Sequence, residues 1–274
     1  MSGETTGEAS DIPAGGDAGR APDTFPDHFS AVAERYARAR PEYPQALFDW
    51  IAALVPARGR VWEAGCGSGQ ATRGLAGVFA EVVATDPSAD QIAQAPVLDN
   101  VRFAIEPAEC SRLDDASVDA VCVAQALHWF DAPAFFAECR RVLRPGGVLV
   151  AWGYQDIIVP PVLRDAVEAF AARIRDAWPA ERFMVDRGYI DIAFPFAQAQ
   201  AGTSPPGEIA VEWPMERLLD YFSSYSAVKR YREAHRVDPV GLHGWSIAGA
   251  WRDAPAPVPL RWPLFVHARR KAYE

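Results

Sequence analysis

Three glycines at alternate positions, and an acid that follows a later apolar run, are the residues of this chain best suited to bind a ligand. Gly65, Gly67 and Gly69 follow the apolar segment 61–64, and Asp86 ends the run 82–85. Glycine adopts positive φ and lets a ligand approach the backbone without a Cβ in the way. A carboxylate after the second strand accepts hydrogen bonds from a ribose diol. The pattern predicts a nucleoside pocket in one half of a doubly wound sheet.

The spacing of the glycines narrows the choice of nucleoside. A dinucleotide motif needs Gly or Ala at its sixth position, where this chain has Gln70 or Thr72, depending on which glycine opens the motif. A P-loop needs Gly-Lys-Ser/Thr, and no lysine follows the turn. The remaining pattern is Glu-x-Gly-x-Gly-x-Gly. Glu63 opens it, where a cationic aminoacyl nucleoside is favoured and a phosphate is not.

Further motifs follow the glycine turn along the chain. They are Asp86-Pro87-Ser88, Pro107-Ala108-Glu109, the apolar run 118–123, Gln125-Ala126-Leu127-His128-Trp129-Phe130-Asp131, and Arg140-Arg141-Val142-Leu143-Arg144-Pro145-Gly146-Gly147. In this order they resemble the class I S-adenosylmethionine-dependent methyltransferases. The string at 125–131 is similar to the branch of trans-aconitate methyltransferases and their bacterial relatives, the type 11 methyltransferases. The similarity runs from about residue 29 to residue 270.

The resemblance implies the fold and the cofactor. The fold is α/β: a doubly wound, mostly parallel, seven-stranded Rossmann-like sheet, with an antiparallel edge hairpin and a lid insertion after strand five. The cofactor is S-adenosyl-L-methionine. The residues assigned to the cofactor are Tyr36, Arg40, Glu63, Gly65, Cys66, Gly67, Gly69, Asp86, Pro87, Ala108, Glu109 and Gln125.

Several of these residues also have structural interpretations. The alternative role of Asp86 is to cap the helix that follows it, and that of Glu63 is to bind the backbone of the glycine turn. Cys66 is suited to a tight turn simply as a small residue. Arg40 and Glu109 fit ordinary solvated positions on the surface.

The acceptor side is expected where His128 follows strand four, at the carboxyl edge of the sheet. His128 is the catalytic candidate, as a general base within hydrogen-bond reach of the acceptor. Its alternative role is to pack and order the loop at Gln125. The candidates for binding the substrate are Trp129, Trp178, Arg182, Arg187 and Tyr189, with core packing or surface charge as their alternative roles. The histidines are scattered without H-x-x-x-H spacing, so no metal is expected.

The predicted activity is methyl transfer to a small molecule, and family analogy favours O-methylation of a carboxylate. One alternative is an N-, O- or C-methyltransferase of natural-product biosynthesis. A second is a cofactor-binding module without catalysis. Neither the acceptor nor the oligomeric state is specified by the sequence.

Composition sets limits around this interpretation. The chain has 274 residues, of which 50% are hydrophobic, and a net charge of −9, which disfavours nucleic acid as a partner. Its four cysteines form no C-x-x-C pair, which favours reduced thiols and a cytoplasmic location. No run of eighteen apolar residues is present, so no membrane partner is expected.

The same pattern predicts the domains and elements. Residues 1–24 are expected to be a disordered tail and 25–274 a single domain, with the lid at about 156–206. Helices are expected at 29–38, 45–54, 71–79, 134–143, 215–233 and 240–251. Strands are expected at 60–63, 81–85, 101–105, 120–124, 148–152, 208–213 and 261–267.

Overall fold

The computed structural model describes residues 40–273, so the tail at 1–24, the helix expected at 29–38 and Tyr36 lie outside it. The strands are β1 (Arg60–Ala64), β2 (Glu81–Asp86), β3 (Val101–Ile105), β4 (Val118–Ala124), β5 (Leu143–Tyr154), β6 (Ala197–Gln198), β7 (Glu208–Glu212) and β8 (Pro259–Arg270). They form one sheet in the order β3-β2-β1-β4-β5-β8-β6, and β7 pairs with β8. Strands β1 to β5 are parallel and β8 is antiparallel to β5. This is the expected doubly wound, mostly parallel architecture.

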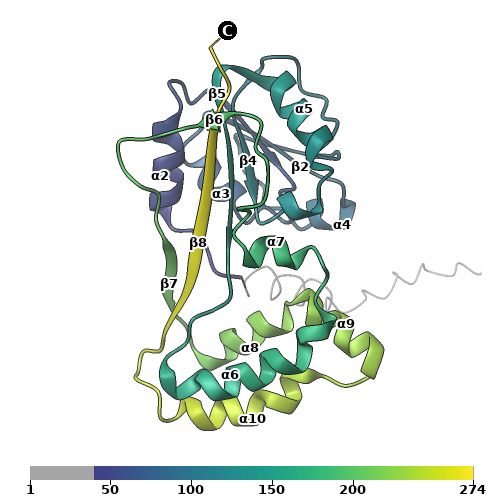
Figure 1. The fold of residues 1–274 in the computed structure, drawn as a ribbon, viewed down its shortest axis with the longest axis vertical. Helices are drawn as coiled ribbons and strands as arrows, with labels where there is room; N and C mark the ends of the chain where they lie inside the picture. The colour runs from purple at the N-terminus through teal and green to yellow at the C-terminus, as the bar shows by residue number, and fades with distance from the viewer. Residues whose placement is uncertain (1–39, 274) are drawn as a thin grey trace, which may run out of the picture.

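Helices cover the sheet and extend beyond one end of it. They are α2 (Gln45–Leu54), α3 (Thr72–Ala76), α4 (Ala89–Ile92), α5 (Ala132–Val142), α6 (Pro161–Ile174), α7 (Arg182–Asp186), α8 (Met215–Ser223), α9 (Ser226–His235) and α10 (Pro239–Trp251), with short turns η1 (Leu127–Trp129) and η2 (Arg175–Ala177). Helices α2 and α5 lie on opposite faces of the sheet (Figure 1). Helices α6, α8, α9 and α10 form a separate layer, the helical cap, beyond the carboxyl ends of the parallel strands (Figure 1).

The central strands are apolar almost throughout because helices cover both faces of the sheet. In β4, residues 118–123 are all buried. Side chains of alternate residues enter two cores: Trp62 packs with α5, whereas Val61 packs with α2 and α3. Burial on both faces fixes the register of the strands, and therefore fixes where their carboxyl ends place polar residues.

The long strand β8 joins the sheet to the helical cap (Figure 1). Its second half pairs with β5, from Leu264 opposite Tyr154 to Arg270 opposite Val148. Its first half pairs with β7. The two expected edge strands pair with each other antiparallel, but they are not a hairpin, because α8, α9 and α10 lie between them in the chain. Strand β7 continues past the end of β5, and the two-residue β6 is the neighbour of β8 at the edge of the main sheet.

The prediction of a single helix at 215–233 is wrong, because the structure has two helices there, α8 and α9. Tyr225 is extended, with φ −71° and ψ 134°. The Ser224 hydroxyl donates to the carbonyl of Tyr221, a local bond that competes with helix continuation. The break leaves the carbonyl of Ser224 outside the helical ladder, where it accepts from Arg40 at 3.0 Å.

Other boundaries also differ from expectation, among them those of α3 and β5. Helix α3 ends at Ala76, short of residue 79, where the amide of Gly77 is shared among the carbonyls of residues 73, 74 and 75. Strand β5 begins at Leu143, and residues 144–147 form an irregularity in its pairing with β4. The Arg-Pro-Gly-Gly sequence thus ends α5 as expected but remains within the strand.

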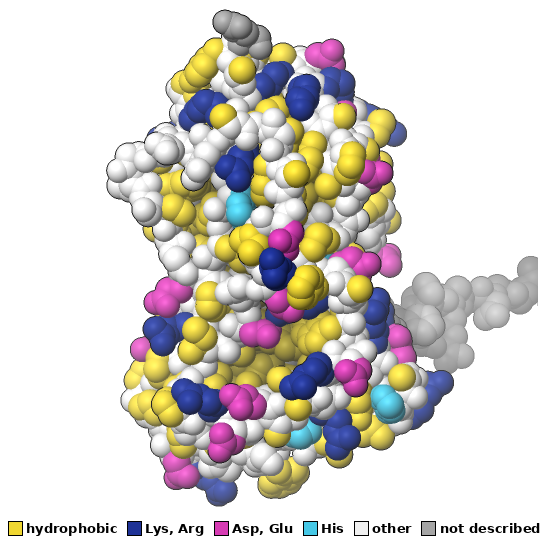
Figure 2. All heavy atoms as spheres, viewed as in Figure 1, with side chains coloured by type: hydrophobic (Ala, Val, Ile, Leu, Met, Phe, Trp, Pro, Cys, Tyr) yellow, Lys and Arg dark blue, Asp and Glu magenta, His cyan; other side chains and the backbone are white. Residues whose placement is uncertain are grey.

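The segment at 156–206 contributes α6 and α7, the region where a lid is expected. Helix α6 packs mainly against α10, from a much later part of the chain. The cap therefore combines this segment with residues 215–251. Figure 2 shows hydrophobic side chains gathered along the waist between the sheet and the cap on the face in view.

Candidate functional site

The glycine turn after β1 has the backbone conformation that its spacing predicts. Gly65, Gly67 and Gly69 have φ of 68°, 55° and 83°. A Cβ on Gly65 would lie 2.8 Å from the Cβ of Ala126, so packing also requires glycine there. A Cβ on Gly67 would meet nothing closer than Gln91 Oε1, at 3.6 Å. The turn is packed at its start and open at its centre, which is where a ligand can approach.

Asp86 fastens this turn to the end of β2. Its Oδ2 accepts from the Gly67 amide and its Oδ1 from the Ser88 amide, both at 2.9 Å. The capping role belongs to Ser88, whose hydroxyl accepts from the amide of Gln91 at 3.3 Å. A carboxylate has about four acceptor positions, so both oxygens of Asp86 retain capacity for a ribose diol.

Glu63 is fully buried beneath the turn. Its Oε2 accepts from the Thr72 hydroxyl at 2.5 Å, while its Oε1 has no hydrogen-bond partner among residues 40–273. The pKa of Glu63 is raised to about 8: burial has the largest effect, the bond from Thr72 lowers the pKa, and the charge of Asp86 raises it. A buried oxygen without a donor is costly. A cationic amine next to Oε1 would supply the missing donor. The sequence analysis did not identify Thr72 as the hydrogen-bond partner of Glu63.

Two other cofactor candidates have structural partners. The thiol of Cys66 is buried and donates to the carbonyl of Gly67 at 3.6 Å, and burial raises the pKa of this thiol. Arg40 donates to the hydroxyl of Tyr154 at 3.4 Å as well as to Ser224. Arg40 therefore joins the end of β5 to the break between α8 and α9.

The loop after β3 is held against α5. Ala108 is buried, and Glu109 Oε1 accepts from the amide of Asp131 at 2.9 Å, while Asp131 caps α5. Pro87, which follows β2, is exposed. Glu109 thus connects this loop to α5.

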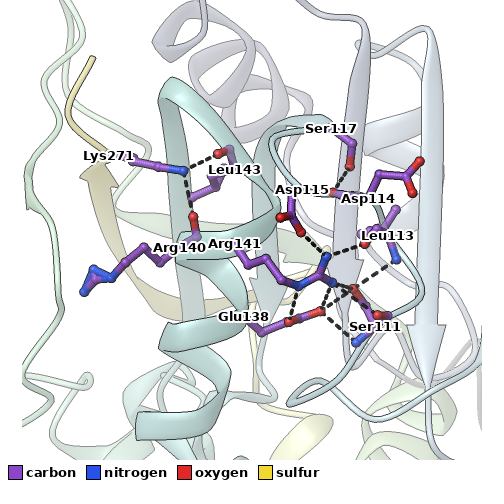
Figure 3. Close-up of polar contacts among 10 residues, drawn as sticks. All are labelled: Ser111, Leu113, Asp114, Asp115, Ser117, Glu138, Arg140, Arg141, Leu143 and Lys271. Carbon is purple, nitrogen blue, oxygen red and sulfur yellow. Dashed lines mark hydrogen bonds and ion pairs between the residues drawn. The ribbon is translucent and has the colours of Figure 1, made fainter. Parts of the chain in front are cut away.

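Arg141 of α5 holds the next part of the same loop (Figure 3). It donates to both oxygens of Glu138, to Asp115 and to the carbonyls of Ser111 and Leu113. These hydrogen bonds hold Glu138 ionised, so its pKa is lowered although burial opposes this. The network fixes the loop that carries the cofactor candidates Ala108 and Glu109.

Gln125, predicted to bind the cofactor, has its amide directed at the backbone of β5. Its Oε1 accepts from the Tyr154 amide at 2.8 Å, and its Nε2 donates to the carbonyl of Tyr154 at 3.2 Å. Its φ is 54°, so the backbone turns sharply as β4 ends. Gln125 therefore ties the carboxyl ends of β4 and β5 together, and this turn leads into η1.

His128 and Tyr189 meet at the acceptor side. The Nδ1 atom of His128 lies 2.8 Å from the hydroxyl of Tyr189, and both side chains are buried. The pKa of His128 is lowered to about 4: burial has the largest effect, the Arg182 guanidinium also lowers the pKa, and Glu181 raises it. The imidazole is therefore neutral at pH 7. Trp129 stands beside it, with ring centroids 4.7 Å apart and 55% of Trp129 exposed.

The two candidate arginines differ in their surroundings. Arg182 donates to Asp156 at 2.5 Å and to Asp186 at 2.6 Å, and its guanidinium lies 4.5 Å from the Trp178 ring centroid. Arg187 forms an exposed two-bond pair with Asp191. Arg182 therefore lies beside His128 and an aromatic wall, while Arg187 has the partner expected of a surface residue. Asp156 was not identified from the sequence.

Comparison with known proteins identifies similar methyltransferases. A family described as a methyltransferase domain matches residues 62–151. A protein of Dictyostelium discoideum named "Putative methyltransferase" is 32% identical over 225 residues, which are 79% of this chain and 83% of that protein. The chain belongs to the class I S-adenosylmethionine-dependent methyltransferases. A solved structure titled a "Putative Type II Methyltransferase" from Anaeromyxobacter dehalogenans is 40% identical, with a TM-score of 0.77 over 86% of this chain and 99% of the other.

The cofactor of the methyltransferase is S-adenosylmethionine. A Saccharomyces cerevisiae protein named a "Probable S-adenosylmethionine-dependent methyltransferase" is 30% identical over 152 residues, about half of each chain. The residues around the glycine turn fit this cofactor: Glu63 has a free buried oxygen, Gly67 has open space beside it, and no cation among residues 40–273 is bonded to Asp86. Within that range no helix is long and apolar enough to cross a membrane, and no cluster of ligands for a metal occurs.

Proposed function

We propose that the methyltransferase O-methylates a carboxylate of a small molecule. The cofactor supplies a methyl group on a sulfonium, which is already a strong electrophile. The protein then has mainly to align the two groups and exclude water, an effect worth up to about 7–11 kcal/mol in favourable cases. A carboxylate is ionised at neutral pH and needs no base. A phenol, an alcohol or an N–H group benefits from one.

The observation that carries this proposal is the buried pair of His128 and Tyr189. An efficient general base has a pKa near the working pH. The pKa of His128 is lowered to about 4, and burial raises the pKa of Tyr189. Neither group matches the requirement for proton removal near pH 7. Their chemistry suits an acceptor that is already ionised.

The surroundings of Arg182 also support an anionic acceptor. Its side chain is 17% exposed, and the hydrogen bonds to Asp156 and Asp186 use its Nε–H and one Nη2–H. A guanidinium has five N–H donors in a fixed geometry, so others remain for a carboxylate. Trp178 and Trp129 offer aromatic surface to the apolar body of such an acid. The net charge of −9 disfavours polyanionic macromolecules as acceptors.

A labelling experiment tests the proposal. The full-length protein is incubated with methyl-labelled S-adenosylmethionine and a panel of organic acids, phenols and amines, and the products are treated with mild alkali. A methyl ester releases labelled methanol, whereas N-methyl, C-methyl and aryl-ether products retain the label. Transfer that yields only alkali-stable products would overturn the carboxylate assignment and favour a natural-product methyltransferase. Cofactor binding without transfer to any acceptor would favour a non-catalytic module.

A further inference from the structure

Tyr189 occupies a backbone conformation that a bulky residue rarely adopts. Its φ is 58° and that of the preceding Gly188 is 60°. Such an outlier persists only where the surroundings hold it, and it often marks a functional constraint. Here the Tyr189 amide donates to the carbonyl of Met184 at 2.9 Å, and His267 Nε2 donates to the Gly188 carbonyl at 2.7 Å. The ring packs edge-on against Phe265, with centroids 4.9 Å apart. The strained turn thus fixes where the phenol hydroxyl lies.

The hydrogen bond of this hydroxyl determines where the proton of His128 lies. Tyr189 is 1% exposed, and within residues 40–273 its hydroxyl has one hydrogen-bond partner, Nδ1 of His128, 2.8 Å away. A buried hydroxyl proton without an acceptor is costly. The hydroxyl therefore donates its proton to Nδ1 of His128. Nδ1 is therefore an acceptor, and the single ring proton of the neutral imidazole is on Nε2.

We infer that Tyr189 is a positioning residue that fixes His128 as its Nε2–H tautomer, so that His128 donates a hydrogen bond to an oxygen of the acceptor and removes no proton. This inference rests on the proposed function for the identity of the acceptor. Nε2 has no hydrogen-bond partner among residues 40–273. The inference selects acceptors that already carry an oxyanion. In the transfer, the bond from methyl carbon to sulfur breaks and a bond to the carboxylate oxygen forms. The sulfonium becomes a neutral thioether and no proton is released.

The charged groups around the ring keep it neutral over the working range of pH. From α7 and the residue that precedes it, Arg182 and Glu181 face His128, and the phenol of Tyr189 faces it from the loop after α7. Burial is the largest of the effects that together lower the pKa of the ring to about 4. The inference therefore requires kcat/KM to be independent of pH between about 6 and 8, because the ring does not titrate in that window.

Nuclear magnetic resonance of the full-length protein, labelled with ¹⁵N in its histidine rings, tests the tautomer without any acceptor. The expected result is an unprotonated Nδ1 and a protonated Nε2 for His128, unchanged from pH 6 to pH 8. The His128→Gln variant assigns the signal. A protonated Nδ1 in the wild-type protein would overturn the inference. Because this measurement needs no turnover, it separates the tautomer from failure of the proposed acceptor class.

Kinetics supply a second test. Tyr189→Phe removes the hydroxyl that fixes the tautomer, so kcat/KM should fall about tenfold with an unchanged dissociation constant for the cofactor. Tyr273→Phe, an exposed tyrosine near the end of the chain, is the matched control and should change neither. His128→Gln retains an amide donor near the Nε2 position and should be more active than His128→Asn. A wild-type rate that rises with pH near neutrality, and loses this rise in His128→Asn, would show a general base and overturn the inference.

Discussion

The cofactor side and the acceptor side of this methyltransferase are built in different ways. Around the glycine turn, backbone amides and side chains from a stretch of some 25 residues make the site, and acceptor capacity is left open at Glu63 and Asp86. Around His128, the polar side chains already bind one another, as in the pairs of His128 with Tyr189 and of Arg182 with Asp156. The pair of His128 with Tyr189 joins residues 61 positions apart in the chain. In the assignment that we propose, the cofactor site is local in the chain, whereas the acceptor site depends on a contact of longer range.

The largest effect should come from the centre of the glycine turn. Gly67→Val places a β-branched residue at φ 55°, which costs roughly 1–2 kcal/mol, and fills the open space beside the turn. We expect the variant to remain folded and to lose cofactor binding by at least about a hundredfold, which is roughly 2.7 kcal/mol. Calorimetric titration and thermal unfolding measure the two effects. Gly202→Val, at a glycine with open space around it, is the control and should bind normally. Normal binding by Gly67→Val would mean that the turn is not the cofactor site.

A smaller effect should follow from Asp86→Ala. The substitution removes charge-assisted bonds to the ribose worth roughly 1.5–3 kcal/mol, so the dissociation constant should rise at least about tenfold. It also releases the amides of Gly67 and Ser88, which predicts a lower unfolding temperature. Asp86→Asn retains one acceptor and should be intermediate in affinity. If both variants bind the cofactor as tightly as the wild type, the ribose assignment is wrong.

Glu63 should make the cofactor-free protein less stable as the pH rises. Its folded-state pKa is raised to about 8, above the usual value near 4.5, so between these values the folded state binds the extra proton. The free energy of unfolding should therefore fall with increasing pH across this window, by at most about 1.4 kcal/mol per pH unit. Glu63→Gln removes the titrating group, and denaturant unfolding between pH 5 and pH 8 should show a weaker decline. An identical pH dependence in the two proteins would contradict the buried, protonated state of Glu63.

The smallest expected effect is a difference in unfolding free energy between variants of two arginines. Arg141→Met leaves the buried carboxylate of Glu138 without its main partner and frees the loop at Ser111, so we expect a loss of roughly 1–3 kcal/mol in unfolding free energy. Arg187→Met removes only an exposed pair with Asp191, so we expect little change in the unfolding free energy. Urea unfolding measures both. Equal losses would show that the network in Figure 3 does not hold the loop on the cofactor side.

Much of the cofactor side could be predicted from the sequence, because its geometry depends on neighbours in the chain. The alternate glycines predict a turn with positive φ, and all three have it. The strand ending at Asp86 and the helix Gln45–Leu54 were also found at the expected positions. Short-range backbone conformation and two-sided burial leave patterns with fixed periods, so these elements can be recognised without knowing what packs against them.

The acceptor side and the cap were decided by tertiary structure. Nothing in the local sequence separates the paired Arg182 from the exposed Arg187, because their carboxylate partners and burial differ only in the folded chain. The break at Ser224 and the left-handed Tyr189 likewise depend on Arg40 and on β8, which are distant in sequence. Local preferences are weak compared with the packing and hydrogen bonds that the whole fold supplies. The sequence by itself therefore determined the fold class and the cofactor, whereas the tertiary contacts determined the burial and the partners of His128, Tyr189 and Arg182, the side chains that we propose to face the acceptor.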